Sequence, residues 1–261
     1  MCLTERRENW MTEQELLNDD GEHLAVEGLK KVFGKKTAVA GITLSMRKGE
    51  IVGFLGPNGA GKTTAFYMIA GFIKPTEGKI LLGTQDISNL PMYKRAQMGI
   101  SYLPQEASIF RKLTVEENIY SILETRSDLT KQQKKDNLEQ LIEEFSIGHI
   151  RKQKAFTLSG GERRRTEIAR ALSMQPKYLL LDEPFSGIDP IAVAEIKSII
   201  RRFAEKNIGV LITDHNVRDT LEITDRAYII NQGQILVSGN KDDILANEQA
   251  KQIYLGEKFS M

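Results

Sequence analysis

Short, continuous apolar runs that end at glycine or at acidic residues dominate the hydrophobic pattern of this chain. They include Glu50–Leu55, Tyr178–Leu181 and Gly209–Thr213. Runs of this length, bounded by turn signals, are typical of strands buried on both faces of a sheet. Two further runs, Tyr228–Ile230 and Gln234–Val237, are separated by a turn and predict a hairpin. We therefore expect a sheet whose central strands are enclosed on both sides.

Helical spacing separates these strands. The residues Thr63–Gly71 follow the first run and predict a helix. A second helix is predicted after Asp189, which suits the N-cap, and Pro190, which suits the first helical position. Its buried stripe is expected to consist of Ile196, Ile199, Ile200 and Phe203. Strands that alternate with helices indicate an α/β fold with a largely parallel sheet.

The middle of the chain, from about residue 91 to 157, has a different character. Helices are predicted over Val115–Glu124 and Asn137–Ser146, and the polar residues 127–137 between them predict a solvated loop and helix start. We interpret the segment as a helical lobe inserted into the α/β core. Residues 1–23 lack an apolar core and predict a flexible tail. Residues 24–261 are expected to form a single domain.

Composition limits the classes of function. The 36 Lys and Arg residues nearly balance the 35 Asp and Glu residues. Proteins that bind nucleic acid usually carry a clear basic excess, so we expect no nucleic-acid partner. Cys2 is the only cysteine, which excludes an internal disulfide. The longest apolar run, Ala65–Ile73, is far shorter than the roughly 20 residues that cross a bilayer, so a cytoplasmic protein without direct membrane insertion is expected.

A glycine-rich motif lies between the first predicted buried strand and the helix after it. It consists of Gly56, Pro57, Asn58, Gly59, Ala60, Gly61, Lys62 and Thr63, and it matches G-x-x-x-x-G-K-T. Glycines let backbone N–H groups surround phosphate oxygens, and the helix N-terminus adds a positive dipole end. Lys62 can reach the β- and γ-phosphates of a nucleotide, and the Thr63 hydroxyl can bind magnesium. The motif predicts binding of ATP and Mg²⁺.

Two adjacent acids follow the buried strand that ends at Leu181. Asp182 and Glu183 stand beyond a strand end, where ligand sites form in open α/β sheets. Adjacent strand residues point to opposite faces, so the two acids can take different tasks. Asp182 would hold magnesium, and Glu183 would activate the attacking water as a general base. An Asp-Glu-Pro sequence alone is more often a simple turn, and the glycine-rich motif upstream favours the catalytic interpretation.

The segment Leu158–Glu162 precedes a predicted helix. Ser159 and Glu162 have the spacing of a capping box, so the simplest interpretation is a well-capped helix start. A capping box does not require the two glycines between them, Gly160 and Gly161. Glycines at a helix N-terminus expose N–H groups to an incoming anion. The segment is therefore also a candidate phosphate contact.

Together these motifs resemble a known family. The glycine-rich motif, extended by Thr64, is followed by Leu158–Glu162, by Asp182 and Glu183, and by His215. In this combination the chain resembles the nucleotide-binding subunits of ABC transporters from about residue 24 to the C-terminus. The resemblance implies an ATPase with a P-loop NTPase core, an antiparallel β subdomain and an inserted helical lobe. It also implies a homodimer in which Leu158–Glu162, the signature segment, contacts the ATP held by the other subunit.

The same resemblance assigns roles to further residues. Phe33 matches the aromatic position that stacks on adenine, and the alternative is a core phenylalanine. Gln105 matches the glutamine that senses magnesium and links to a membrane partner. His215 matches the switch histidine that holds the γ-phosphate and the attacking water. Asp189 matches the D-loop aspartate at the dimer interface, a role compatible with its predicted N-cap position.

Longer segments resemble the ATPase subunits of lipopolysaccharide exporters in particular. They are Phe66–Met68, Tyr102–Arg111, Gly161–Arg165, Thr213–Arg218 and Ile253–Phe259. The resemblance implies a dimer that drives two transmembrane permease subunits of a lipopolysaccharide export complex, on the cytoplasmic face of the inner membrane. An importer ATPase for branched-chain amino acids stays open as an alternative, although the second and last of these segments favour export. A non-transport ABC protein is the third possibility, but such proteins usually carry two cassettes or long coiled coils.

The stretch Ala107–Leu113 is the predicted contact for a membrane partner. We expect a groove there for a short cytoplasmic helix of a transmembrane subunit. Ile109 and Phe110 would serve as apolar anchors, and Arg111 would place a charge at the rim. The alternative is a locally packed loop.

Overall fold

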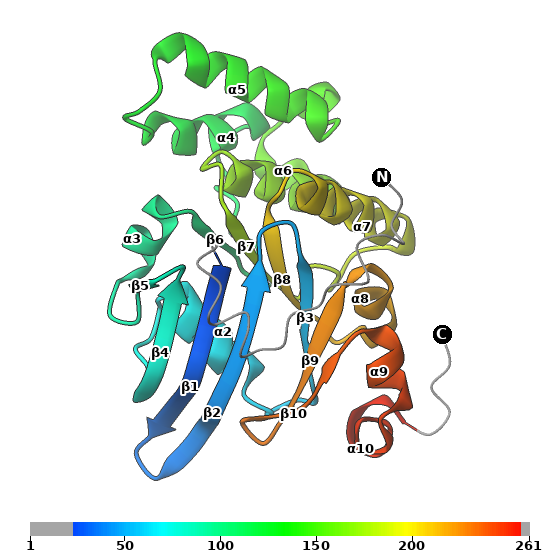
Figure 1. Cartoon of the computed structure of the whole chain (residues 1–261). Helices are drawn as coiled ribbons and strands as arrows, with labels where there is room; N and C mark the ends of the chain where they lie inside the picture. Colours follow the sequence, from blue (N-terminus) through cyan, green and yellow to red (C-terminus); the bar gives the residue numbers. More distant parts are fainter. Residues whose placement is uncertain (1–22, 257–261) are drawn as a thin grey trace.

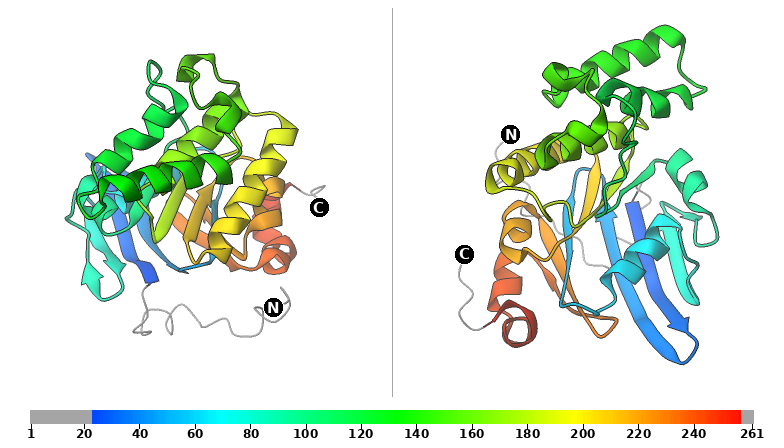
Figure 2. Two further views of the ribbon diagram at one scale, coloured as in Figure 1. Left: turned by 90° about the horizontal axis from the view of Figure 1, so that it is seen from above. Right: turned by 180° about the vertical axis from the view of Figure 1, so that it is seen from behind.

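The computed structural model describes residues 23–256. The predicted tail, with Cys2, lies outside the described residues except for His23, which begins the first strand. The last residues of the segment Ile253–Phe259 lie outside them as well. Within the described part, two sheets are surrounded and separated by helices (Figure 1, Figure 2).

An antiparallel sheet is formed by N-terminal strands in the order β2-β1-β4-β5. The bounds of its strands are β1 His23–Phe33, β2 Lys36–Arg47, β4 Glu77–Leu82 and β5 Gln85–Asp86. The turn between β1 and β2 contains Gly34, whose φ of 58° suits a residue without a side chain. This sheet is the antiparallel β subdomain that the family resemblance implies.

The second sheet has the strand order β10-β9-β3-β8-β7-β6. Its strands are β3 Ile51–Leu55, β6 Ile100–Leu103, β7 Tyr178–Asp182, β8 Gly209–Thr213, β9 Arg226–Asn231 and β10 Gln234–Gly239. All neighbours pair in parallel except the β9–β10 hairpin. Every residue of β3, β7 and β8 is buried, which confirms the predicted enclosed strands.

The α-helices follow the strands of both sheets. Their bounds are α2 Lys62–Ala70, α3 Met92–Gln97, α4 Val115–Glu124, α5 Lys131–Glu144, α6 Gly160–Leu172, α7 Pro190–Glu205, α8 Val217–Ile223, α9 Lys241–Ala246 and α10 Glu248–Ala250. Short helical turns are η2 Gly148–Ile150, η3 Ala155–Thr157 and η4 Lys251–Leu255. Helix α7 begins at Pro190 after the N-cap Asp189, and its predicted apolar stripe is buried, as expected.

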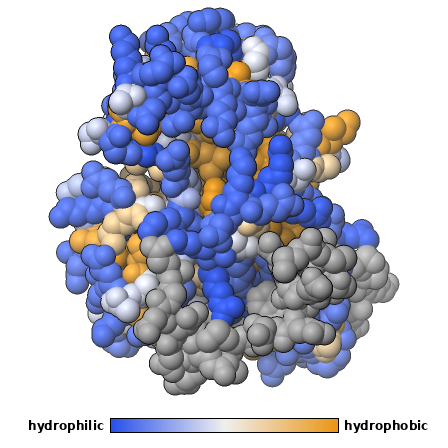
Figure 3. All heavy atoms as spheres, turned by 45° about the horizontal axis from the view of Figure 1, so that its top comes forward, coloured by the Kyte–Doolittle hydropathy of each residue, from blue (hydrophilic) through white to orange (hydrophobic). Residues whose placement is uncertain are grey.

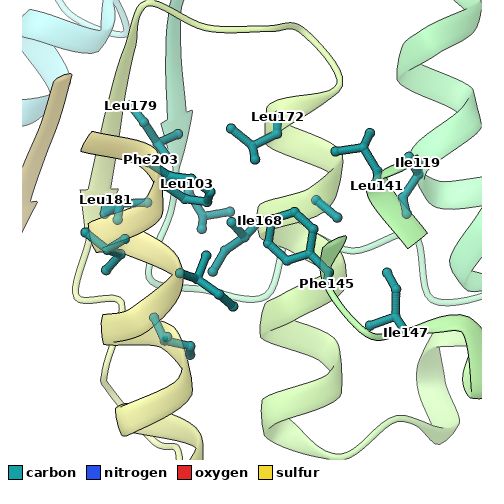
Figure 4. Close-up of a cluster of buried hydrophobic side chains, with 14 of the residues drawn as sticks. Leu103, Ile119, Leu141, Phe145, Ile147, Ile168, Leu172, Leu179, Leu181 and Phe203 are labelled. Carbon is teal, nitrogen blue, oxygen red and sulfur yellow. The ribbon is translucent and has the colours of Figure 1, made fainter. Parts of the chain in front are cut away.

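The six-stranded sheet is covered on both faces by apolar side chains. Alternate residues of a strand point to opposite faces, and β7 uses both. Tyr178 and Leu180 pack with α2 and the antiparallel sheet, so α2 lies between the two sheets. Leu179 and Leu181 pack on the other face against α6 and α7. Figure 4 shows this second cluster, with Phe203 beside the two leucines.

Helices α4 and α5 form an upper part that stands away from the sheets (Figure 1). Ile119 of α4 and Leu141 of α5 pack toward Leu172 of α6 (Figure 4). One continuous apolar cluster therefore joins this upper part to the sheet through α6. Side-chain caps at Thr114 and Thr130 begin α4 and α5, and the Thr130 cap explains why α5 starts earlier than the predicted Asn137.

The predicted start of the helical lobe at residue 91 is wrong for its first part. Strand β6 lies inside the 91–157 segment, yet it pairs in parallel with β7 at the edge of the six-stranded sheet. Helix α3 contacts β6. The strand has four residues, and Ser101 and Tyr102 interrupt its apolar pattern. A run this short and mixed gives no clear strand signal.

No helix in residues 23–256 is long and apolar enough to cross a membrane. Figure 3 shows a mostly hydrophilic surface, with hydrophobic residues gathered in a band across its middle. Large apolar side chains that the core does not cover are Phe33, Tyr67, Phe72, Met92, Tyr93, Phe110, Phe156, Ile191 and Ile253. Several of them belong to segments that carry the predicted site or its predicted partner contact.

Candidate ATPase site

The glycine-rich motif forms a tight loop between β3 and α2, as predicted. The backbone of Gly56 has φ 153° and that of Gly61 has φ 108°, in the range that favours glycine. A Cβ at Gly56 would stand 2.1 Å from the carbonyl oxygen of Ile230, and one at Gly61 would stand 2.5 Å from that of Ala38. Only glycine fits at these two positions, so the motif is required by the shape of the loop.

Helix α2 follows the loop directly, and its N-terminus has no side-chain cap. The N-cap Gly61 makes no side-chain hydrogen bond, and the first turn of α2 holds no acidic residue. Helices α4, α5, α6 and α7 differ, because each has a side-chain cap. Free N–H groups and the positive dipole end make such a terminus suitable for a phosphate. The loop therefore fits the polyphosphate of ATP.

Lys62 is directed back over this loop. Its Nζ donates hydrogen bonds to the carbonyl oxygens of Gly56, at 2.6 Å, and Pro57, at 3.0 Å. Burial lowers the pKa of Lys62, and the negative charges of Glu183 and Asp182 oppose that shift. The loop lysine and the two acids thus share one electrostatic environment, although they lie far apart in the sequence.

The two acids stand at the end of β7 with different surroundings. Both carboxylate oxygens of Asp182 accept hydrogen bonds, Oδ1 from the Thr213 hydroxyl at 2.7 Å and Oδ2 from the Tyr102 hydroxyl at 3.0 Å. Asp182 is 6% exposed, so its orientation is fixed by these two donors. The N–H of Glu183 donates to the carbonyl of Thr213 at 2.8 Å, which anchors the next residue to β8.

Glu183 brings the three predicted catalytic residues together. Its Oε2 accepts a hydrogen bond from Nε2 of Gln105 at 2.5 Å. Its Oε1 lies 2.6 Å from Nε2 of His215. Burial raises the pKa of Glu183, the charge of His215 opposes the shift, and the nearby Asp214 adds to it. A partly buried carboxylate with a raised pKa is the group expected of a general base.

The signature segment forms a capping box, as predicted. The Ser159 hydroxyl accepts from the N–H of Glu162 at 3.4 Å, and the Glu162 carboxylate accepts from the N–H of Ser159 at 2.8 Å. The positions of Gly160 and Gly161 face Gly187, Ile188 and Ala192, around the start of α7. In the described part of the chain, no hydrogen bond or ion pair joins Ser159, Gly160, Gly161 or Glu162 to the glycine-rich loop.

Most of the remaining predicted site residues lie on exposed positions. Asp189 accepts a hydrogen bond from the N–H of Ala192 at 3.0 Å, so it caps α7 as predicted. Phe33 ends β1 with 49% of its surface exposed and carries the Lys31 ammonium 5.2 Å from its ring centre. This exposure excludes the alternative of a core phenylalanine. Thr63 is exposed at the first turn of α2, whereas Thr64 is half-buried.

Two buried charged residues that the sequence analysis missed tie the signature helix to the segment after Gln105. Arg164 donates to the carbonyl of Pro104 at 2.9 Å. Glu167 accepts from the N–H groups of Ser108, at 2.7 Å, and Ile109, at 3.1 Å. The sequence could have indicated them only through the helical spacing that places Arg164 and Glu167 on the buried face of α6, and no known motif includes this pair.

The predicted partner groove needs a correction at Ile109. This side chain is 6% exposed and belongs to the main apolar cluster, so it cannot anchor a partner. The N–H of Ile109 is also held, by a hydrogen bond to Glu167. Phe110 is 50% exposed, with the Arg170 guanidinium 5.1 Å from its ring centre, and Arg111 is exposed. The anchor available at the surface is therefore Phe110 alone.

The residues at the strand ends fit magnesium rather than a soft metal. Within residues 23–256 no group of three or more His, Cys, Asp or Glu residues could hold a metal by itself. Mg²⁺ typically takes one or two protein oxygens and completes its shell with phosphate oxygens and water. The Thr63 hydroxyl, the Gln105 side-chain oxygen and the Asp182 carboxylate provide such oxygens beside the loop.

Comparison with known proteins identifies the class to which this site belongs. Residues 39–186 match the family model described as ABC transporter. The chain belongs to the ABC transporter family of ATP-binding proteins, and it is an ABC-type ATPase. The predicted family and the predicted P-loop NTPase fold are thereby confirmed.

Individual relatives narrow this class. The chain is 54% identical to the lipopolysaccharide export system ATP-binding protein LptB of Haemophilus influenzae, over 91% of this chain and 99% of that protein. It is 50% identical to LptB of Escherichia coli K12 over the same shares. Among solved structures, an ATP-binding cassette of an ABC transporter in its ADP conformation aligns with a TM-score of 0.80 at 30% identity, over 90% of this chain and 99% of that one.

Proposed function

We propose that this chain is the ATP-hydrolysing subunit of a lipopolysaccharide exporter, with residues from 24 onward as its single ATP-binding domain. The observation that supports it best is the identity of 54% to a lipopolysaccharide export ATPase subunit along 99% of that protein's length. An identity this high over a full domain leaves the fold and the arrangement of its motifs nearly unchanged.

The proposed substrate complex is ATP with Mg²⁺. The N–H groups at the start of α2 and the Lys62 ammonium bind the phosphates, and Phe33 stacks on the adenine. Thr63, Gln105 and Asp182 hold the metal. Magnesium, when bound, neutralises charge on the β- and γ-phosphates and orients the γ-phosphate for attack.

Glu183 is the proposed general base. Its carboxylate accepts a proton from the water that attacks the γ-phosphate, and the bond from that phosphorus to the β,γ-bridging oxygen breaks. Gln105 and His215 hold the carboxylate from both sides, at 2.5 Å and 2.6 Å, so it has little freedom to turn away. His215 is also the proposed contact to the γ-phosphate and the attacking water.

A homodimer completes the proposed site. Ser159 and the N–H groups of Gly160 and Gly161 are the proposed contact to the second ATP, while the Ser159 hydroxyl caps only the N–H of Glu162. Among the described residues, they make no bond to the glycine-rich loop of their own chain. A second copy, placed head to tail, brings this segment over the ATP. Asp189 would then lie at the interface between the copies.

The proposed partners are two transmembrane permease subunits, and the proposed location is the cytoplasmic face of the inner membrane. Phe110 and Arg111 form the exposed contact for a short cytoplasmic helix of such a subunit. Affinity capture from detergent-solubilised membranes, followed by identification of the co-purified chains, tests this assignment. Permeases for branched-chain amino acids in place of lipopolysaccharide export subunits would overturn it.

The catalytic assignment is tested with Glu183→Gln. This variant keeps a hydrogen-bonding side chain of the same shape but removes the base, so we expect ATP binding to persist while turnover falls by roughly 100-fold or more. Nucleotide binding and phosphate release are measured on the same preparation. Glu106→Gln is the matched control, because Glu106 is an exposed glutamate beside Gln105. Turnover near the wild-type rate in Glu183→Gln would remove Glu183 from the role of base.

A further inference from the structure

The hydroxyl of Tyr102 contacts a carboxylate that the function assigns to magnesium. It donates to Oδ2 of Asp182 at 3.0 Å, while Thr213 donates to Oδ1 at 2.7 Å. A carboxylate has about four lone-pair positions, so each oxygen keeps one for a metal or a metal-bound water. The two donors therefore select which lone pairs point toward the nucleotide.

The register of three neighbouring strands produces this arrangement. Asp182 of β7 pairs directly with Thr213 of β8. Tyr102 of β6 pairs with Leu180, two residues before Asp182. Residues two apart on a strand share a face, so Tyr102 and Asp182 are diagonal neighbours on one face of the sheet. The contact follows from the backbone of the sheet rather than from a mobile loop.

The ring of Tyr102 is held from outside by two further aromatic residues. Its centre lies 6.3 Å from that of Tyr67, at an interplanar angle of 87°, and 5.2 Å from that of Phe72, at 74°. Tyr67 and Phe72 also contact each other, with ring centres 5.3 Å apart. Edge-to-face contacts of this kind fix ring orientation.

These two outer rings reach the surface. Phe72 is 49% exposed and Tyr67 is 38% exposed, whereas Asp182 is buried. A set of three packed aromatic side chains thus leads from solvent to the Asp182 carboxylate. We call Tyr67, Phe72 and Tyr102 the aromatic trio.

We propose that Tyr102 is a positioning residue that holds the Asp182 carboxylate in the orientation that binds magnesium. Through the aromatic trio, this orientation depends on the exposed rings of Tyr67 and Phe72. The inference rests on the proposed function, since Asp182 must be a magnesium ligand. Groups that hold a ligand from the outer shell commonly change metal affinity 10–100-fold when they are removed. The trio also offers a physical route by which contact at the surface alters the metal site.

Tyr102→Phe tests the hydroxyl, since it removes the donor and keeps the ring. The affinity for a fluorescent, non-hydrolysable ATP analogue is measured with Mg²⁺ and with EDTA. We expect the gain in affinity due to Mg²⁺ to fall about tenfold or more in the variant, while the affinity in EDTA stays at the wild-type value. The unchanged EDTA value shows that the variant is folded and that the loop still binds phosphate.

Tyr93→Phe is the matched control, because Tyr93 is an exposed tyrosine on the nearby helix α3 with no ring contact to Tyr102. An equal Mg²⁺-dependent gain in Tyr102→Phe and in wild type would overturn the positioning role. A wild-type protein that gains no affinity from Mg²⁺ would instead refute the metal site of the proposed function. The two failures are therefore distinguishable.

Phe72→Leu tests whether the outer rings matter. This change keeps an apolar side chain but removes the edge-to-face contact. We therefore expect Phe72→Leu to reduce the gain in affinity due to Mg²⁺, by a factor several-fold smaller than the reduction in Tyr102→Phe. Met92→Leu, a change of another exposed apolar residue near Gly71, is expected to have no effect. A wild-type gain in Phe72→Leu would overturn the link to the surface, even if Tyr102→Phe behaves as expected.

Discussion

At the scale of the residue, the site combines strain with close contacts. Glu183 has φ 45°, in the left-handed region that costs a residue with a side chain about 1–2 kcal/mol. The backbone bond to Thr213 and the contacts to Gln105 and His215 hold it there. Strain of this kind persists only where the surroundings over-determine a residue, which is typical of active sites. The strained backbone thus places the carboxylate between its two partners.

Lys62→Ala is predicted to weaken ATP binding. The Lys62 ammonium lies over the loop, and charge-assisted hydrogen bonds to phosphate contribute about 1.5–3 kcal/mol each. The loss of one such bond corresponds to a decrease in affinity of roughly 10–100-fold. Titration of a fluorescent ATP analogue measures it, with the exposed Lys79→Ala as control. Equal affinities of the two variants would contradict the assignment of the loop.

Single residues also show what the sequence could predict and what it could not. The loop and the pair Asp182 and Glu183 were predictable because each is a contiguous motif after a strand. The contact between Tyr102 and Asp182 was not, because it depends on the register of β6 against β7. The burial of Ile109 was also missed, since it depends on packing into a cluster formed by residues far away in the sequence. Such contacts between distant buried polar groups leave no local pattern.

At the scale of the element, periodicity predicted most strands and helices because burial dictates it. The runs that became β3, β7 and β8 are buried at every residue, and the stripe of α7 faces the core. The failures are elements whose burial is mixed. Strand β6 has four residues with a polar middle, and the C-terminal helices α9 and α10 are too short for a helical period to emerge.

One buried residue connects helices α2 and α3, and its loss is predicted to destabilise the fold. Arg95 of α3 is 1% exposed and donates to the carbonyls of Met68 and Ile69, each at 2.7 Å, at the end of α2. It also bonds the carbonyls of Ser88 and Leu90. Arg95→Met leaves these acceptors without their donor, which costs about 3 kcal/mol or more.

Thermal unfolding measures this effect. A loss of about 3 kcal/mol lowers the melting temperature of a domain of this size by roughly 6–12 °C. Lys94→Met changes the adjacent, exposed residue of the same helix and is expected to leave the melting temperature within about 2 °C. If both variants melt together with wild type, Arg95 is not the connection between α2 and α3 that its contacts indicate.

At the scale of the whole molecule, the two halves of the predicted ATP site lie on different parts of the fold. The glycine-rich loop lies between β3 and α2, and α2 is enclosed by the two sheets. The signature segment begins α6, which is continuous with the upper helices through one apolar cluster. In the structure of one chain, the predicted phosphate-binding loop and the predicted signature contact therefore do not meet. A head-to-tail dimer would unite one of each.

This arrangement makes a prediction about mixed dimers. In a dimer of one Glu183→Gln chain and one Gly160→Asp chain, one composite site carries both defects and the other carries none. Each parent homodimer has two damaged sites. We therefore expect the mixed dimer to hydrolyse ATP well above both parents, measured in the assembled transporter purified through a different affinity tag on each chain. A Cβ at Gly160 would meet its nearest atom at 3.7 Å, an ordinary contact, so the substitution is compatible with the fold.

The control for this experiment pairs two defects of the same half-site. A dimer of one Glu183→Gln chain and one Lys62→Ala chain has a damaged loop or base in each composite site, so no activity should return. If the sites were instead complete within one chain, the Glu183→Gln and Gly160→Asp pair would also stay inactive, because each chain would keep its own defect. Recovery in the first pair together with none in the second is the result that only sites shared between two chains produce.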